Sequence, residues 1–226
     1  MSELAIIVGA GPGLSASLAR LCAREGMRVV LAARDVAKLA ALAEETGASV
    51  QACDASRRED VDALFDAVLD GEGVPDLVVF NPSARVRGAV ADIDPEAVER
   101  AIAITAYGGF LVGRRAAMAM RERGSGSIQF TGASASVKGY PESGCFAMGK
   151  FALRGLAQSM ARELAPKGVH VAHFVIDGGI ESDVRVPNHD EWLDPDAIAQ
   201  TYLHVHRQHR SAWTWEVELR PWVEHF

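Results

Sequence analysis

The sequence predicts an α/β protein that forms one domain over residues 1–226, with a seven-stranded parallel sheet and helices on both faces. Two observations carry this prediction. Apolar runs of strand length alternate along the chain with longer segments of helical periodicity, and the strand runs are apolar at consecutive positions. Strands that are apolar on both faces are typical of a parallel sheet that helices cover from both sides.

The predicted strands and helices alternate in chain order. The strands span residues 4–8, 28–33, 49–53, 76–81, 127–131, 169–176 and 212–219. The first helix begins at residue 14, and the others span residues 36–45, 58–69, 95–120, 144–165 and 195–206, with a break expected at Gly108-Gly109. Every crossover is long enough for a helix, and such connections are right-handed.

The composition favours a soluble globular protein and argues against several classes of partner. Apolar residues make up 49% of the chain and charged residues 23%, and the formal net charge is −7. This charge disfavours nucleic acid and anionic membranes as partners, and no apolar run nears the ~20 residues of a membrane span. The three cysteines lack metal or CxxC spacing, so we expect a reduced, cytoplasmic protein. We predict no metal site, because His204 and His206 would point to different faces of a helix.

The apolar strand at residues 4–8 runs directly into a glycine-rich turn, and an apolar helical pattern follows at once. This order of strand, turn and helix is the arrangement that holds the pyrophosphate of a dinucleotide. Glycine lets the backbone approach the phosphates, and the N–H groups at the helix start supply donors and partial positive charge. The turn therefore predicts cofactor contacts at Gly9, Gly11, Pro12, Gly13 and Leu14.

Further short motifs follow in order along nearly the whole chain. They are Cys53-Asp54-Ala55, Phe80-Asn81-Pro82-Ser83, Phe146-Ala-Met-Gly-Lys150 and Asp177-Gly178-Gly179-Ile180-Glu181-Ser182. With the glycine turn, this series resembles the short-chain dehydrogenase/reductase family, which implies a Rossmann fold and a nicotinamide dinucleotide cofactor. The resemblance implies that Asp54 binds the adenine amino group. It also implies cofactor contacts from Asn81, Lys150, Gly178, Ile180 and Ser182.

The residues after the second strand bear on which nicotinamide cofactor binds. In a Rossmann unit, an acid about 20 residues past the glycine turn binds the ribose 2′-hydroxyl of NAD. That position is Ala33 here, and Arg34 follows it with a guanidinium that suits a 2′-phosphate. We predict NADP, with NAD as the alternative cofactor and a solvated loop charge as the alternative interpretation of Arg34. Asp35 is expected to cap the next helix.

Most residues of the family's carbonyl chemistry are replaced. The resemblance implies a Tyr that protonates the carbonyl oxygen, a Lys that lowers the pKa of this Tyr, a Ser that holds the oxygen and an Asn that maintains a water. Lys150 is kept, whereas Phe146 stands at the Tyr position, Ala133 at the Ser position and Thr105 at the Asn position. Loss of a general acid lowers a rate by about 10²–10⁴. We therefore expect ordinary ketone turnover to be very slow.

Two neighbouring residues are candidates to replace the lost groups. Ser134 follows the Ser position by one residue, and Tyr140 lies in the loop before the helix that carries Lys150. Ser134 is either a catalytic hydroxyl or a plain turn serine. Tyr140 is either a phenol donor or a packing or surface residue. The candidate catalytic set is thus Lys150, Ser134 and Tyr140.

The leading functional interpretation is a divergent NAD(P)-dependent oxidoreductase that acts on a small-molecule carbonyl or an activated C=C bond. The alternative is a catalytically silent NADP-binding protein that acts as a sensor or partner subunit. Lys150 favours the first interpretation, and the three substitutions favour the second. The family resemblance implies that the helices at residues 95–120 and 144–165 pair across a two-fold axis. Their apolar content predicts a homodimer or homotetramer.

Overall fold

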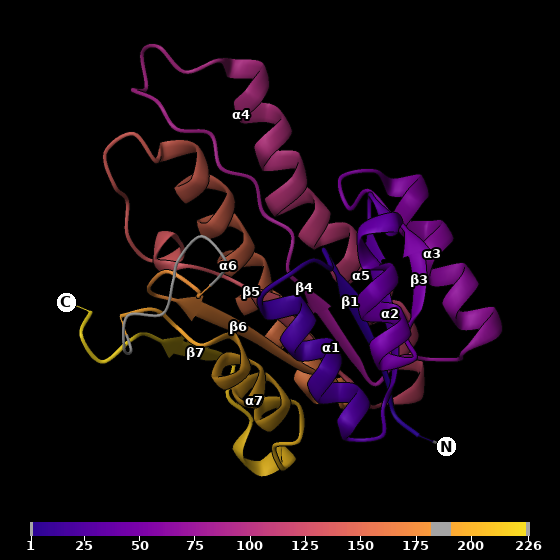
Figure 1. The fold of residues 1–226 in the computed structure, drawn as a ribbon. Coiled ribbons are helices and arrows are strands. Elements are labelled where there is room, and N and C mark those ends of the chain that lie inside the picture. Colours follow the sequence, from indigo (N-terminus) through magenta and orange to yellow (C-terminus); the bar gives the residue numbers. More distant parts are fainter. Residues whose placement is uncertain (1, 182–190, 225–226) are drawn as a thin grey trace.

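The computed structural model describes residues 2–181 and 191–224, and its strands form one sheet (Figure 1). The strand order is β3-β2-β1-β4-β5-β6-β7, and every neighbouring pair is parallel. The strands are β1 (Leu4–Val8), β2 (Arg28–Ala33), β3 (Ser49–Ala52), β4 (Leu77–Phe80), β5 (Ser127–Thr131), β6 (His170–Ile176) and β7 (Glu216–Leu219). The predicted α/β fold with a seven-stranded parallel sheet is confirmed.

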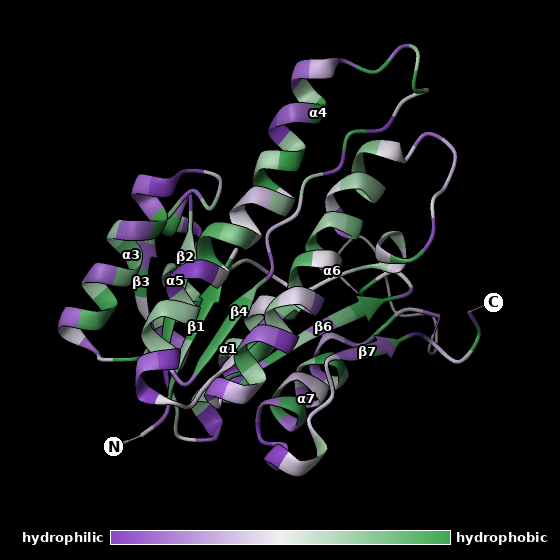
Figure 2. Ribbon diagram, turned by 180° about the vertical axis from the view of Figure 1, so that it is seen from behind, coloured by the Kyte–Doolittle hydropathy of each residue, from purple (hydrophilic) through white to green (hydrophobic). Residues whose placement is uncertain are grey.

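Strand β1 shows how the sheet divides the core into two layers. Its residues are completely buried, and alternate side chains face opposite sides of the sheet. Leu4, Ile6 and Val8 pack into one buried cluster, whereas Ala5 and Ile7 pack into the other. Figure 2 shows the central strands as continuous apolar segments between the helices. Burial on both faces therefore explains the unbroken apolar runs in the sequence.

Helices cover both faces of the sheet. The cluster that contains Ile7 receives apolar side chains from α1 (Leu14–Arg24), α2 (Ala40–Thr46) and α7 (Pro195–His206). The other cluster receives them from α3 (Arg58–Gly71), α5 (Gly108–Arg123) and α6 (Gly144–Leu164). Helix α4 (Pro95–Ile102) leads toward α5 and projects beyond the sheet (Figure 1). Within residues 2–181 and 191–224, no helix combines the length and apolar character needed to cross a membrane.

The long helix expected over residues 95–120 is interrupted earlier than predicted. A π-helical turn at Ala103–Tyr107 separates α4 from α5, and Gly108 begins α5. The prediction of a break at Gly108-Gly109 is therefore wrong. A Cβ at Gly108 would lie 2.8 Å from the carbonyl oxygen of Ala55, so this glycine allows α5 to pack closely against the segment after β3.

Two further elements differ from their predictions. Strand β7 begins at Glu216 rather than at residue 212, because residues 210–212 form a 3₁₀ turn that the His209 side chain caps. The helix expected at residues 36–45 is divided into a 3₁₀ turn (Val36–Leu39) and α2. Asp35 precedes this turn, but its side chain makes no capping hydrogen bond and pairs with Lys38 at 3.3 Å. The other elements lie within two residues of their predicted bounds.

Candidate functional site

The glycine turn joins β1 to α1 at the edge where the parallel strands end. Gly9 and Gly13 both have a φ of +80°, which glycine adopts without strain. A Cβ at Gly9 would lie 2.7 Å from the backbone N of Pro82, so the turn and the segment after β4 meet with no room for a side chain. A Cβ at Gly11 or Gly13 would meet nothing within 4 Å. The turn therefore leaves open space beside the start of α1.

The start of α1 offers hydrogen-bond donors to an anion. The first N–H groups of an α-helix lack intrahelical acceptors, and the helix dipole adds partial positive charge there. Gly13 at the N-cap contributes no side-chain acceptor, and the first turn from Leu14 carries no acidic residue. This end of α1 therefore fits the pyrophosphate of a dinucleotide.

A cleft of about 480 Å³ beside this turn brings half of the predicted cofactor residues together. Its lining includes Gly9, Gly11, Pro12, Arg34, Asp54 and Asn81, and also Lys38, which the sequence did not single out. These residues follow four neighbouring strands, β1 to β4. In open parallel sheets, ligands bind at the carboxyl ends of the strands, where the strand order reverses. In this sheet the order reverses at β1, between β2 and β4.

Asp54 is a half-buried carboxylate in the cleft. Its Oδ1 accepts hydrogen bonds from the backbone N–H of Ser56 at 3.0 Å and from Ser56 Oγ at 2.7 Å. Burial acts to raise the pKa of Asp54, but the bonds from Ser56 and the charges of Arg34 and Arg57 together bring this pKa below its ordinary value. Asp54 is therefore an ionised acceptor, which suits a contact to an adenine amino group.

Two cations line the end of the cleft that follows β2. Arg34 is exposed and comes directly after Ala33, the last residue of β2. Lys38 lies one helical turn further and pairs with Asp35 at 3.3 Å, with both side chains largely exposed. Such exposed pairs are weak, so the Lys38 ammonium can exchange Asp35 for another anion. A guanidinium and an ammonium at this place fit a 2′-phosphate better than a bare 2′-hydroxyl.

Asn81 holds the glycine turn in shape. Its side-chain amide donates to Ser15 Oγ at 2.7 Å, and Ser15 Oγ donates to the carbonyl oxygen of Gly9 at 3.2 Å. Ser15 itself is buried. The two side chains thus link β1, α1 and the end of β4. The sequence motifs did not point to this bridging role of Ser15.

Lys150 lies on α6 with its ammonium group buried. The residue is 2% exposed, and Nζ donates to the carbonyl oxygen of Thr131, the last residue of β5, at 2.7 Å. Burial, followed by the positive charge of Arg85, lowers the pKa of Lys150 to about 7. A group with such a pKa exchanges a proton readily near neutral pH.

The Phe146 ring contacts two cations at the position of the family's acid. Lys150 Nζ lies 5.7 Å from the ring centroid, and Arg85 Cζ lies 4.2 Å from it. Both distances are within the range of cation–π contacts. Arg85 belongs to the segment after β4 and was not predicted as a site residue. Nothing in the sequence distinguishes it from Arg87, because only the folded segment brings its guanidinium to α6.

The other candidates for proton transfer lie in different environments. Ser134 is half-buried and begins a short 3₁₀ turn (Ser134–Ser136) that packs against α6. Tyr140 is 45% exposed in the loop before α6. Thr105 is buried, and its Oγ1 accepts a hydrogen bond from the backbone N–H of Ala84 at 3.1 Å. The catalytic roles of Ser134 and Tyr140 stay predictions.

A buried polar chain fixes the 3₁₀ turn that begins at Ser134. Ser136 Oγ accepts from the Ala133 N–H at 3.1 Å and lies 3.3 Å from His173 Nε2. His173 Nδ1 lies 3.1 Å from Glu216 Oε2, and Glu216 pairs with Arg154 at 2.6 Å. Burial lowers the pKa of His173 to about 4, although Glu216 opposes this effect. Neutral His173 therefore donates from Nδ1 to Glu216 and accepts from Ser136 at Nε2.

The segment after β6 carries the last predicted cofactor residues. Asp177 is buried and pairs with Lys138 at 3.1 Å. Gly178 has a φ of +157°. Ile180 forms an isolated parallel bridge with Leu193, which lies just before α7. Ser182 lies outside the described residues. The cofactor contacts of Gly178, Ile180 and Ser182 stay predictions.

Two histidines at the end of α7 and just after it, His206 and His209, have partners within the chain. His206 Nδ1 lies 2.7 Å from Ser127 Oγ, and its Nε2 lies 3.3 Å from Glu3 Oε1. His209 Nδ1 lies 2.8 Å from Ser211 Oγ. Across the described part of the chain, no three His, Cys, Asp or Glu side chains are grouped so that they could hold a metal ion.

Known proteins share this architecture along the chain. The sequence profile of the short chain dehydrogenases matches residues 3–191. An uncharacterized oxidoreductase of Staphylococcus saprophyticus is 26% identical over 233 residues, which cover 97% of each chain. The crystal structure of a short-chain dehydrogenase from Rhodopseudomonas palustris aligns with a TM-score of 0.86 at 34% identity, over 97% of this chain and 99% of that one. A metagenomic short-chain oxidoreductase in complex with NADP aligns with a TM-score of 0.86 at 28% identity, over 98% of both chains. The resemblance inferred from the motifs is confirmed, and the chain belongs to the short-chain dehydrogenase family of oxidoreductases.

Proposed function

We propose that this protein is an NADP-dependent oxidoreductase that acts on a small-molecule carbonyl or activated C=C compound. The observation that carries the proposal is the cleft that joins the open glycine turn, the ionised Asp54 and the cations Arg34 and Lys38. These groups match a pyrophosphate, an adenine amino group and a 2′-phosphate in turn. The NADP complex of the metagenomic relative supports the same cofactor.

The reaction needs one hydride and one proton. Reduced NADP bound in the cleft would supply the hydride to the substrate carbon, and the protein has to supply the proton to the oxygen or to the second carbon. Phe146 has no proton to give, whereas the Lys150 ammonium has a pKa of about 7. We assign proton donation to Lys150, which then recovers a proton from solvent. Proton transfer by a positioned group of matched pKa contributes about 10²–10⁴ to a rate.

The test combines binding with turnover. NADPH and NADH are titrated by fluorescence, and NADPH consumption is followed with aldehydes, ketones, quinones and enoyl compounds. We expect tighter NADPH binding, turnover of some members of this panel, and rates that fall above about pH 7 as Lys150 loses its proton. Lys150→Met should abolish this pH dependence together with most of the turnover. Turnover by Lys150→Met equal to that of the wild type would refute the assigned donor.

Two negative outcomes carry different meanings. Tight NADPH binding without any turnover would favour the silent-binder alternative, in which the protein acts as a sensor or partner subunit. Failure to bind either dinucleotide would refute the cofactor proposal itself. The turnover assay therefore separates the two candidate functions, and the titration tests the cofactor that both of them require.

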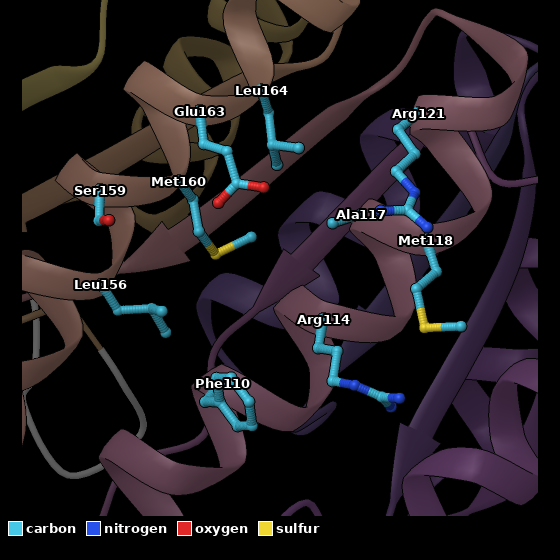
Figure 3. Close-up of a pocket in the computed structure, with 10 residues that line it drawn as sticks. All are labelled: Phe110, Arg114, Ala117, Met118, Arg121, Leu156, Ser159, Met160, Glu163 and Leu164. Atoms are coloured by element: carbon cyan, nitrogen blue, oxygen red, sulfur yellow. The ribbon is translucent and has the colours of Figure 1, made fainter.

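We also propose that two copies of the chain assemble through α5 and α6. A groove of about 460 Å³ lies between these helices, with apolar side chains from both and with charged residues at its rim (Figure 3). Phe110 on α5 and Phe151 on α6 are each 45% exposed. Arg114 and Arg121 on one helix and Glu163 on the other offer opposite charges to a second copy related by a two-fold axis.

A further inference from the structure

A chain of polar contacts leaves α6 at Arg154 and reaches the turn that follows β5. Arg154 donates to both carboxylate oxygens of Glu216, the first residue of β7, at 2.6 and 2.8 Å. Glu216 Oε2 lies 3.1 Å from His173 Nδ1, and His173 Nε2 lies 3.3 Å from Ser136 Oγ. His173 and Ser136 are completely buried, so water does not compete for these contacts. The chain thus links α6 to that turn through β7 and β6.

The backbone from Thr131 to Ala133 closes this chain on α6. The Ala133 N–H donates to Ser136 Oγ at 3.1 Å. Two residues earlier, the carbonyl oxygen of Thr131 accepts a hydrogen bond from Lys150 Nζ at 2.7 Å. Lys150 lies about one helical turn before Arg154, where the chain begins. The polar contacts therefore form a ring that includes the proposed proton donor.

His173 also packs directly against Gly132. A Cβ at Gly132 would overlap the His173 imidazole and would lie 2.7 Å from the carbonyl oxygen of Phe174. The Gly132 N–H donates to the same carbonyl oxygen at 2.7 Å. Two successive residues of β6 thus support the peptide group between Thr131 and Gly132. The carbonyl of this peptide group is the one that accepts from Lys150.

The charges around His173 keep it neutral near pH 7. Burial lowers the pKa of His173 to about 4, the cations Lys150 and Arg154 of α6 add to this effect, and Glu216 opposes it. A neutral imidazole accepts at one nitrogen and donates at the other, whereas a protonated ring only donates. His173 can therefore accept from Ser136 while it donates to Glu216, which the ring of contacts requires.

The carbonyl of Thr131 opposes the two effects that discharge Lys150. Burial and then the positive charge of Arg85 lower the pKa of Lys150 to about 7. A hydrogen bond from the ammonium to a carbonyl favours the charged form instead. Strand β5 and the turn Ser134–Ser136 contribute no ionisable side chain that could do so. The protonated fraction of Lys150 therefore depends on where the Thr131 carbonyl is held.

The geometry points to His173 as a positioning residue for Lys150: through Ser136 it fixes the backbone whose carbonyl, on Thr131, accepts from the ammonium. This inference rests on the proposed function, in which Lys150 gives the proton, and it names the residue that keeps this donor in place. His173 acts through the protein and does not contact the substrate. Its loss frees the backbone after Thr131, weakens the bond to the ammonium and leaves more of Lys150 neutral.

The experiment follows the amine of Lys150 itself. The chain has four lysines, so full-length protein labelled with ¹³C at lysine Cε gives few NMR signals, and the signal missing from Lys150→Met belongs to Lys150. This signal is titrated with pH in the wild type, His173→Phe, His173→Gln and Ser136→Ala, and circular dichroism checks that each variant is folded. The matched control is His170→Gln, which removes another buried histidine of β6 on the opposite face of the sheet.

We expect Lys150 to titrate near pH 7 in the wild type. The midpoint should fall by roughly one pH unit in His173→Phe and in Ser136→Ala, the scale of a weakened hydrogen bond to a charged group. His173→Gln should shift it less, because the amide oxygen can still accept from Ser136. His170→Gln should not shift it. At pH 7 a fall of one unit lowers the protonated fraction about fivefold, and NADPH turnover should fall by the same factor.

The outcomes separate this inference from the proposed function. If Lys150 titrates at the same pH in folded Ser136→Ala as in the wild type, the inference is wrong even when carbonyl compounds are reduced, and His173 then only stabilises the fold. If His173→Phe does not fold, Ser136→Ala, which removes a single hydroxyl, decides the question. If the midpoint falls as expected but no compound is reduced, the role of His173 stands and the oxidoreductase proposal fails. The titration needs no turnover, so the two proposals are tested independently.

Discussion

The hydroxyl oxygen of Thr105 accepts a hydrogen bond from the backbone N–H of Ala84 at 3.1 Å. Thr105 is 1% exposed and lies in the π-helical turn between α4 and α5. Its position is the one where the family resemblance implies an Asn that maintains a water. In this chain the polar group at that position instead ties the segment after β4 to the helical layer of the protein.

Thr105→Val should lower the free energy of unfolding by about 1–3 kcal/mol, because the half-buried Ala84 N–H loses its acceptor while the side chain keeps its shape. Urea denaturation measures this loss. Thr105→Ser retains the acceptor and serves as the control. The serine variant should keep most of the stability that the valine variant loses, and equal losses in the two variants would contradict the role given to this bond.

Arg34→Ala should weaken NADPH binding by about 1–3 kcal/mol and leave NADH binding nearly unchanged, since only the 2′-phosphate uses the guanidinium. Fluorescence titration with both cofactors measures the difference. Arg24→Ala, which removes an exposed arginine in the last turn of α1, is the matched control and should change neither affinity. Equal affinities of the wild type for NADH and NADPH would refute the predicted preference.

The fold was predictable because its determinants are local in the sequence. The apolar run at residues 4–8 and the glycines after it are readable as a strand and a turn, and each later strand repeats the pattern. The errors occur where tertiary contacts, rather than the local sequence, determine where a helix or strand begins or ends. Gly108 was expected to break the helix, but the structure shows that a glycine is needed there because the carbonyl group of Ala55 packs against it. The last strand was predicted from residue 212, yet β7 begins only at Glu216.

The cofactor cleft was predictable for the same reason, whereas the substrate side was not. Gly9, Arg34 and Asp54 are identified by motif or by distance from the glycine turn, and the structure gathers them in one cleft. Arg85 has no motif, because its contact with Phe146 joins residues that are far apart in the sequence. The effect of its charge on the pKa of Lys150 likewise follows only from the folded structure.

The folded protein should lose stability in mild acid through His173. The pKa of His173 is about 4 in the folded chain, against an ordinary value of 6.5. Between these values the unfolded chain binds a proton that the folded chain excludes, so the free energy of unfolding falls as the pH falls from 6.5 to 4. The full loss is about 3 kcal/mol, at about 1.4 kcal/mol for each pH unit.

Urea denaturation of the wild type, His173→Gln and His204→Gln over this pH range tests the assignment. The slope of unfolding free energy against pH should become shallower by up to one proton in His173→Gln. His204 is exposed, so its variant should follow the wild type. An unchanged slope in His173→Gln would mean that other histidines account for the acid lability.

Phe110→Glu should dissociate the proposed dimer into monomers. Phe110 is 45% exposed at the groove between α5 and α6, and a carboxylate there would be buried against a second copy. Light scattering at micromolar concentration should give at least the dimer mass for the wild type and the monomer mass for the variant. Val90→Glu, at a residue that is 90% exposed in the segment before α4, is the control and should not change the mass. A monomeric wild type would contradict the assembly.

The last prediction concerns the replaced acid. Wild-type protein should reduce simple ketones very slowly, because Phe146 supplies no proton. Phe146→Tyr combined with Ala133→Ser should raise this rate by about 10²-fold, since a phenol and an oxygen-binding hydroxyl return beside Lys150. Phe151→Tyr, which adds a phenol at an exposed position of α6, is the matched control and should have no effect. NADPH consumption with a panel of ketones measures all three proteins. Wild-type rates of about 1–10³ s⁻¹ on simple ketones would contradict the prediction. The donor would then be sought with Tyr140→Phe and Ser134→Ala, in that order, because a second phenol is the most direct substitute for the missing one.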